Sequence, residues 1–491
     1  MMTMPMTLIA AVFLPLLLSP LILLTGRRPN LRETVTLVTG GATFLVVLSI
    51  LPEVMAGGRP SVELLQVLPG LTLGFRVEPL GMLFSLVASG LWIVTSLYAI
   101  GYMRGHHEID QTRFYFFFAV AITAAIGVAF AQNLLTLFIF YEVLTLSTYP
   151  LVTHARTPEA MRGGRIYMGI LLSTSVVFLL FAIIWTWSIT GTLEFQEDGI
   201  LSGKASEGVI LVLLALYAFG TGKAALMPFH RWLPAAMVAP TPVSALLHAV
   251  AVVKAGVFTV MKIIVYVFGI DLLSETDISV WLMYVAGGTV LIASLVAMTK
   301  DNLKARLAYS TVSQLSYVVL GAMLVTEASI IGSGIHIAMH AFGKITLFFC
   351  AGAILVAAHK TNVSELDGLG WTMPVTMLAF LVGALSVIGL PPLGGSWSKF
   401  LLAMGAARTE QYIFITVLMV STLLNVAYLI PPVVRSFFIL PNGTSMTPIR
   451  IKEAPITCLA AICVTATGSI ILFFVADSLY DLLSPIVTVP G

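Results

Sequence analysis

Charged residues are scarce in this sequence. Lys and Arg number 25 and Asp and Glu 23, so charged residues make up only 10% of the 491 positions. Soluble globular domains carry about 25%, and the apolar share here is 58%. The composition therefore excludes an ordinary water-soluble domain and indicates a polytopic, all-α membrane protein.

Cysteine is also rare, and nucleotide-binding signatures are missing. Cys350, Cys458 and Cys463 lie in apolar segments without the paired spacing of a disulfide framework or zinc site. We find no Gly-rich phosphate loop, and we expect no strands for one to follow. The sequence thus predicts no cofactor, no metal site and no nucleic-acid partner, and it argues against an enzyme acting on a soluble substrate.

Long apolar runs take the place of these missing features. A run of about 20 residues is enough to cross a hydrocarbon core about 30 Å thick. We predict 14 membrane-spanning helices, at residues 6–26, 33–51, 78–101, 114–131, 133–154, 165–190, 208–228, 241–268, 278–299, 305–326, 328–358, 373–405, 411–438 and 455–477. The first is followed, not preceded, by positive charge, so we expect a retained helix instead of a signal peptide.

The distribution of Lys and Arg predicts the orientation. If the N-terminus is outside, 16 of the 25 basic residues fall in inner loops and four, Arg59, Arg76, Lys204 and Arg408, in outer loops. Short cytoplasmic loops retain positive charge, so we expect both termini on the outer side. The remaining five basic residues lie inside predicted spans: Lys223, Lys254, Lys262, Lys344 and Lys399.

Ionisable residues within spans are costly and need a reason. A charge at the bilayer centre costs about 2.5 to 3.5 kcal/mol on insertion scales and usually faces protein or a wet cavity. Lys262 is close to the end of its span, so we interpret it as snorkelling to the surface. Glu142 is the only carboxylate deep in the first half. It serves either as a structural ion-pair partner or as a group that biases the protonation of a nearby lysine.

Two segments place several titratable groups close together. Lys223 and Lys254 occupy consecutive spans, and His248 precedes Lys254 by about one and a half turns. His336, His340 and Lys344 follow the spacing i, i+4, i+8, which puts them along one side of a helix. A proton relay is one interpretation of these two sets. Satisfied packing histidines and a polar seam between helices are the alternatives.

Prolines and glycines predict two interrupted helices. Pro228 lies five residues after Lys223, and the sequence GLPPLGGSWSKF ends beside Lys399. Irregular backbone at membrane depth is tolerated only inside protein or next to water. The interrupted spans are the seventh and twelfth, each the fourth of a five-helix set. We predict N-terminal helices at 1–113, two inverted five-helix repeats at 114–268 and 278–438, and a last helix and C-terminus at 439–491.

Four stretches carry a resemblance to a known family. They are NLLTLFIFYEVLTLSTYPLV, GKAALMPFHRWLPAAMVAPTPVSALLHAVAVVKAGVF, HIAMHAFGKITLFFCAGAI and GLPPLGGSWSKF. They resemble the antiporter-like subunits of respiratory complex I, membrane-bound hydrogenases and Mrp-type cation/proton antiporters. Within this superfamily the chain is most similar to the antiporter-like subunits of the Mrp type. Lys399 stands where some complex I subunits have glutamate, which favours the Mrp or the hydrogenase side of the superfamily.

The resemblance implies a function and a set of site residues. Such subunits move protons, in Mrp complexes in exchange for sodium or another monovalent cation, and they work with other membrane subunits in the bacterial cytoplasmic membrane. The site residues it implies are Glu142, Lys223, His248, Lys254, His336, His340, Lys344 and Lys399. The alternatives are a proton-pumping subunit of a complex I-like oxidoreductase or hydrogenase, and a scaffold whose buried charges only hold helices together.

Overall fold

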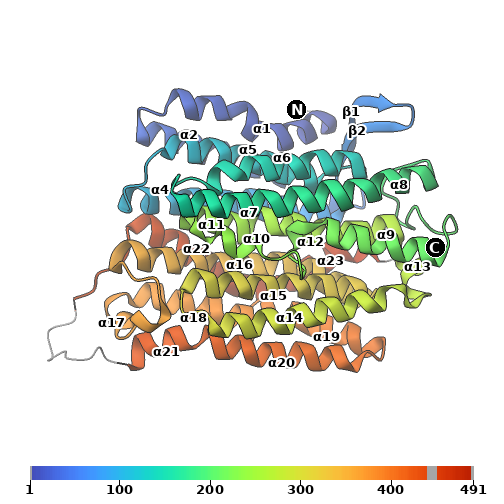
Figure 1. Cartoon of the computed structure of the whole chain (residues 1–491). Coiled ribbons are helices and arrows are strands. Elements are labelled where there is room, and N and C mark those ends of the chain that lie inside the picture. The colour runs from blue at the N-terminus through green and yellow to red at the C-terminus, as the bar shows by residue number, and fades with distance from the viewer. Residues whose placement is uncertain (1–2, 440–449, 488–491) are drawn as a thin grey trace.

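The molecule is a bundle of roughly parallel helices, seen in a computed structural model that describes residues 3–439 and 450–487 (Figure 1). The N-terminal half comprises α1 (Met4–Leu24), α2 (Pro29–Leu48), α3 (Leu51–Met55), α4 (Pro79–Gly105), α5 (Gln111–Ala129), α6 (Leu134–Val152), α7 (Pro158–Thr174), η1 (Ser175–Leu179), α8 (Leu180–Thr190), α9 (Glu207–Gly220), η2 (Gly222–Ala224), α10 (Trp232–Ala235), η3 (Ala236–Val238), α11 (Thr241–Ala245), η4 (Leu246–Val250), α12 (Val252–Ile263) and η5 (Ile264–Phe268).

The second half of the chain adds further helices to the same bundle. It comprises α13 (Ile270–Ser274), η6 (Asp277–Ser279), α14 (Val280–Thr299), α15 (Leu303–Met323), α16 (Glu327–Ala358), η7 (Val363–Glu365), α17 (Leu369–Thr372), α18 (Pro374–Ile388), α19 (Gly395–Arg408), α20 (Tyr412–Leu429), α21 (Pro431–Phe438), α22 (Ile456–Phe474), α23 (Ala476–Leu483) and η8 (Ser484–Ile486). Every predicted span coincides with one helix or a series of helical segments, and the described residues include 11 helices long and apolar enough to cross a membrane.

Two of the predicted spans are interrupted, as the prolines indicate. In the seventh span α9 ends at Gly220, and only the short η2 turn follows before residue 232. In the twelfth, α18 ends at Ile388 and α19 begins at Gly395. Ala225 and Gly389 follow the two helical ends with positive φ angles of 54° and 91°, a left-handed conformation that stops a helix.

A β-hairpin contradicts our expectation that the chain has no strands. Strand β1 (Ser61–Leu68) pairs antiparallel with β2 (Leu71–Arg76), with Ser61 opposite Arg76 and Leu68 opposite Leu71. The turn is Pro69–Gly70, and Gly70 has a φ of +77°, which a side chain would disfavour. The strands were missed because this loop is short and apolar, and its strand character depends on pairing. The hairpin lies at the right-hand end of Figure 1.

The eighth and eleventh spans occupy the centre of the bundle. All of the most apolar stretch within 241–268 is buried, and α16 is buried over nearly its whole length. By contrast, α1, α20 and α22 leave large apolar side chains such as Leu24, Leu423 and Phe474 exposed, as lipid-facing helices do. Ionisable residues on the two central helices therefore face other protein groups and not lipid.

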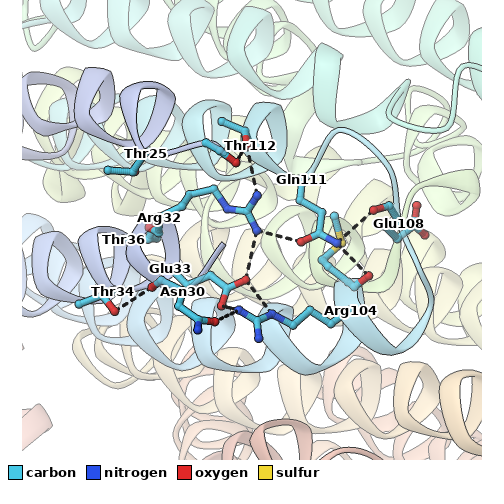
Figure 2. A network of polar contacts seen from close by, with 12 residues as sticks. Thr25, Asn30, Arg32, Glu33, Thr34, Thr36, Arg104, Glu108, Gln111 and Thr112 are labelled. Atoms are coloured by element: carbon cyan, nitrogen blue, oxygen red, sulfur yellow. Dashed lines mark hydrogen bonds and ion pairs between the residues drawn. The ribbon is translucent and has the colours of Figure 1, made fainter. Parts of the chain in front are cut away.

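A network of arginines and carboxylates joins α2 to α4 at the left-hand end of the bundle (Figure 2). The Glu33 carboxylate accepts hydrogen bonds from Arg104 at 2.5 and 3.1 Å and from Arg32 Nη2 at 3.1 Å. Arg32 also donates to Gln111 Oε1 at 2.9 Å and to Thr112 Oγ1 at 3.2 Å. Each charge in this network has a partner, which is how buried ions are stabilised.

The loops predicted to be inner and outer lie at opposite ends of the bundle. Arg28 and Arg104 line one pocket at the left-hand end. At the right-hand end, residues near the described C-terminal limit, such as Ile486, line a pocket with Glu197 and Asp271. Residues 1–2, 440–449 and 488–491 lie outside the described residues, and so do both chain termini and part of the predicted 439–491 segment.

Candidate functional site

Lys223 lies in the break of the seventh span and is held by α6. Its Nζ donates to the Tyr141 carbonyl at 2.8 Å and to Thr145 Oγ1 at 2.6 Å, and it stands 3.1 Å from the centre of the Tyr141 ring. The Lys223 backbone N–H donates to Tyr141 Oη at 3.1 Å. The side chain is fully buried. All its direct partners are therefore neutral groups.

Glu142 does not form the ion pair that the sequence allowed. It is half-buried, and neither carboxylate oxygen has a hydrogen-bond partner among the described residues. No ion pair within 4 Å joins it to Lys223 in the part of the chain that the structure describes. Glu142 directly follows Tyr141, whose carbonyl accepts the Lys223 hydrogen bond. Glu142 is thus close enough to influence Lys223 without fixing it in place.

Lys254 and the two histidines of α16 form a connected line. Lys254 Nζ and His340 Nδ1 are 2.5 Å apart. The His340 and His336 rings stack at 5.7 Å between centroids with an interplanar angle of 12°. His336 Nδ1 is 2.9 Å from Ser398 Oγ, on α19. The i, i+4 spacing on α16 thus brings the eighth, eleventh and twelfth spans together through polar groups.

Lys399 terminates this line at the second helix break. Its Nζ donates to the carbonyl of Ile388, the last residue of α18, at 2.9 Å. The same nitrogen lies 4.9 Å from the centre of the Tyr317 ring, which in turn stacks on His336 at 5.7 Å. A helix C-terminus carries partial negative charge, so the interrupted helix creates a place for an ammonium group. This explains why a break and a lysine occur together here.

Lys344 branches from the line toward α15 and α20. Its Nζ donates to Ser310 Oγ at 2.5 Å, and Tyr428 Oη lies 2.9 Å from the same oxygen. Tyr428 also bonds to Asn425. The serine hydroxyl therefore links the lysine to a second set of buried polar groups.

His248 lies in a π-helical turn within the eighth span. A π-turn widens a helix locally and often occurs at functional sites. The ring is fully buried, and neither nitrogen has a hydrogen-bond partner among the described residues. Its ring centroid lies 4.7 Å from that of Phe348, one turn of α16 beyond Lys344. His248 is near the lysines but is not joined to them directly.

The two halves of the candidate site meet through backbone and not through side chains. Within the described residues, no hydrogen bond joins Lys223 to His248 or Lys254. Helix α12 nevertheless packs on η2 at Gly256, where an added Cβ would lie 2.3 Å from the carbonyl carbon of Lys223. Glycine at this position is what allows α12 to approach the break so closely.

Several polar residues of the site were missed by sequence reasoning. They are Tyr141, Thr145, Ser310, Tyr317, Ser398 and Tyr428, together with Lys304, whose buried Nζ donates to the Ala239 carbonyl at 2.6 Å. Lys304 was counted with the inner loops. The unusual cluster of hydroxyl residues in AYSTVSQLSY, within a predicted span, is the signal that would have drawn attention to α15.

Lys262 contradicts the snorkelling interpretation. Its side chain is 0% exposed and pairs with Glu78 Oε2 at 3.2 Å. Proximity to the end of the span was misleading because the segment between α5 and α6 and the loop after α8 cover this end of α12. No group of His, Cys, Asp or Glu suited to a metal ion occurs in residues 3–439 and 450–487.

Comparisons with known proteins agree with this architecture. Residues 131–425 match the family described as NADH:quinone oxidoreductase/Mrp antiporter, TM. Subunit N of the NADH-quinone oxidoreductase of Desulforudis audaxviator is 32% identical over 72% of this chain and 70% of its own length. Chain 5 of the NAD(P)H-quinone oxidoreductase of Synechocystis sp. is 30% identical over 67% of this chain. This chain spans about half of that relative, 49%.

Two solved structures share the fold over the whole chain. One is from the Mrp complex of Dietzia sp. DQ12-45-1b, with a TM-score of 0.87, 22% identity, and coverage of 99% of this chain and 97% of that one. The other is from the membrane-bound sulfane sulfur reductase, an archaeal respiratory membrane complex, with a TM-score of 0.86, 22% identity, and coverage of 98% and 97%.

The fold is that of a multi-pass, predominantly helical membrane protein. The chain belongs to the family of NADH:quinone oxidoreductase and Mrp antiporter transmembrane subunits.

Proposed function

We propose that this chain is the proton-translocating subunit of a multisubunit Mrp-type antiporter that exchanges protons for Na⁺ or another monovalent cation. The observation that carries the proposal is the buried line from Lys254 through His340 and His336 to Ser398. Lysine and imidazole both accept and release protons. A line of such groups through an apolar bundle is suited to moving protons.

The direct partners of the buried lysines are uncharged, and this favours a transport role over a scaffold role. Within the described residues, Lys223, Lys254 and Lys344 have no carboxylate within 4 Å. A purely structural charge would be expected to have one, because an unpaired buried ion is costly. Lysines held by carbonyls, hydroxyls and imidazole are instead free to change protonation state.

The proposed path uses all eight site residues. Protons pass among Lys223, His248 and Lys254, then His336, His340 and Lys344, and leave at Lys399, while Glu142 biases the charge of Lys223. The two helix breaks mark matched positions in the proposed repeats 114–268 and 278–438, with 1–113 and 439–491 flanking them. Cation movement is coupled electrostatically in neighbouring subunits.

The proposed setting is the bacterial cytoplasmic membrane, with both termini outside. The proposed partners are the other membrane subunits of the same complex, and the chain itself carries no catalytic role. The positive loops gathered at one end of the bundle support this orientation. The Mrp structure and the respiratory-complex structure each share 22% identity with this chain, and both bear on the fold alone.

A second candidate function is proton pumping in a redox-driven complex. It is favoured by the names of the sequence relatives, which are quinone oxidoreductase subunits. In that case the redox centres would belong to partner subunits, and the buried line would move protons in response to electron transfer elsewhere.

The test is sodium-dependent proton movement in everted vesicles from antiporter-deficient cells that express the complete neighbouring operon. We expect exchange without any electron donor, and its loss in Lys223→Ala with assembly intact. Proton movement that requires a reductant would assign the chain to the redox-driven complex. Loss of assembly in Lys223→Ala would favour the scaffold role, which also predicts that neutralising Glu142 and Lys223 together is tolerated.

A further inference from the structure

One buried lysine differs from the others in its partners. Lys262, near the end of α12, pairs with Glu78 Oε2 at 3.2 Å and donates to the Ala131 carbonyl at 2.6 Å. Its Nζ is also 4.4 Å from the centre of the Phe195 ring. Lys262 is 0% exposed and Glu78 4%. Among the described residues it is the one lysine with a carboxylate within 4 Å.

Glu78 also forms part of the wall of a pocket at the hairpin end of the bundle. The pocket has a volume of about 380 Å³, and its lining includes Arg76, Glu78, Phe195, Gln196, Glu197 and Tyr266. We call this pocket the vestibule. The remaining charges around it are Arg59, which also lines it, and Glu194, which pairs with Arg76 at 3.6 Å. One carboxylate, Glu78, is thus shared between the vestibule and the buried lysine.

Lys262 and Lys254 belong to the same helix. The two positions are eight residue steps apart, which corresponds to about 12 Å of rise and an angular offset of about 80°. Thr259 lies in this interval, and its buried hydroxyl oxygen has no hydrogen-bond partner among the described residues. The neighbouring Phe258 packs on Phe84 at 5.1 Å. Around the helix axis Thr259 is about 60° from Lys262 and about 140° from Lys254, so its hydroxyl lies on the Lys262 side of this interval.

We propose that the vestibule is the outer-face proton port of the buried line and that the Lys262–Glu78 pair is its gate. A proton from the vestibule neutralises the Glu78 carboxylate and releases the Lys262 ammonium. The ammonium passes its proton by way of the Thr259 hydroxyl toward the neutral amine of Lys254. The Lys262 amine then takes the proton from the Glu78 carboxyl group, and the ion pair is restored. This inference rests on the proposed function and adds an entrance to it.

The substitution Lys262→Arg separates a proton-carrying role from a structural one. Arginine keeps the positive charge and the pair with Glu78, but it does not release its proton in proteins. In vesicles with the complete complex we expect normal assembly and thermal stability with proton movement reduced about 100-fold, as for loss of a proton-transfer group. The matched control is Lys204→Arg, on an exposed loop at the same end, which should leave transport unchanged. Wild-type transport by Lys262→Arg would overturn the proposal.

A second measurement tests the proposed port even if the Lys262→Arg variant fails to assemble. Gln196, exposed in the vestibule, is replaced by Cys in a Cys463→Ser background, because Cys350 and Cys458 are buried. A cationic, membrane-impermeant thiosulfonate reagent added to right-side-out vesicles should modify the new cysteine and block proton movement. Complete modification without loss of transport, no modification, or modification from the inner face alone would each overturn the proposal.

The same vesicles distinguish this inference from the proposed function. If unmodified wild-type vesicles exchange protons for cations and only the Lys262 and Gln196 results disagree, the port is wrong and the antiporter assignment stands. If wild-type vesicles show no exchange without a reductant, the antiporter assignment itself fails.

Discussion

The arginine network between α2 and α4 and the lysine line at the centre are both buried and charged, yet they are built in opposite ways. Around Glu33, two arginines share one carboxylate in short, partly bidentate hydrogen bonds. Around Lys254 and Lys344, the partners are imidazole and hydroxyl groups. Arginine stays charged and fits carboxylates geometrically, whereas lysine exchanges its proton. The first region is suited to holding helices together and the second to carrying charge between them.

The largest expected effect comes from removing a proton carrier. Lys254→Gln should lower transport about 100-fold, because a group that transfers protons is replaced by one that does not. Assembly should be preserved, since glutamine can still bond to His340. Proton movement in vesicles, normalised to assembled complex, measures this. Substantial transport by Lys254→Gln would show that the line bypasses this residue.

The opposite result is expected at the arginine network. Glu33→Gln leaves Arg32 and Arg104 facing each other without a counter-charge and should destabilise the protein by about 3 kcal/mol. Thermal unfolding in detergent measures the loss, with the exposed Glu63→Gln in β1 as the control. Transport per assembled complex should stay at the wild-type level. A loss of transport in Glu33→Gln without a loss of thermal stability would contradict the proposed difference between the two regions.

A third variant tests the contact between the two halves of the line. Gly256→Ala places a methyl group against the backbone of Lys223 and Ala224, so α12 must shift, at a cost of about 1 to 3 kcal/mol. We expect a reduced transport rate and a lower unfolding temperature together. Gly288→Ala is the matched control, because nothing lies within 4 Å of its added Cβ. Equal behaviour of the two variants would mean that the close approach is unimportant.

The smallest effect is expected at a hydroxyl relay group. Ser398→Ala removes the partner of His336, and a hydrogen bond contributes about 1 kcal/mol, which corresponds to about a fivefold lower rate. Ser396→Ala, two residues away, is the control, since that hydroxyl bonds only to the Leu393 carbonyl. Ser398→Thr should restore transport. If both alanine variants transport alike, Ser398 is not part of the path.

Much of the fold follows from short-range features of the chain. Apolar runs of span length and the proline and glycine clusters around Lys223 and Lys399 are local, so the many helical spans and both interruptions were predictable. The hairpin at 61–76 was not, because its strand character depends on pairing between two apolar segments and not on a local breaker. The burial of Lys262 was not predictable either, because it depends on which loops cover the end of α12.

By itself, the sequence determined that this chain spans the membrane many times and that the seventh and twelfth predicted spans are interrupted. It also determined which titratable residues lie inside the spans. The i, i+4 spacing of His336 and His340 already placed them on one helix face. Only the tertiary structure decided the partners of the site residues. Lys254 contacts His340, Ser398 contacts His336, and Lys223 bonds to the Tyr141 carbonyl and the Thr145 hydroxyl instead of to Glu142. The physical reason is that helix formation is a local property of the chain, whereas the partner of a buried charge is set by which helices pack together.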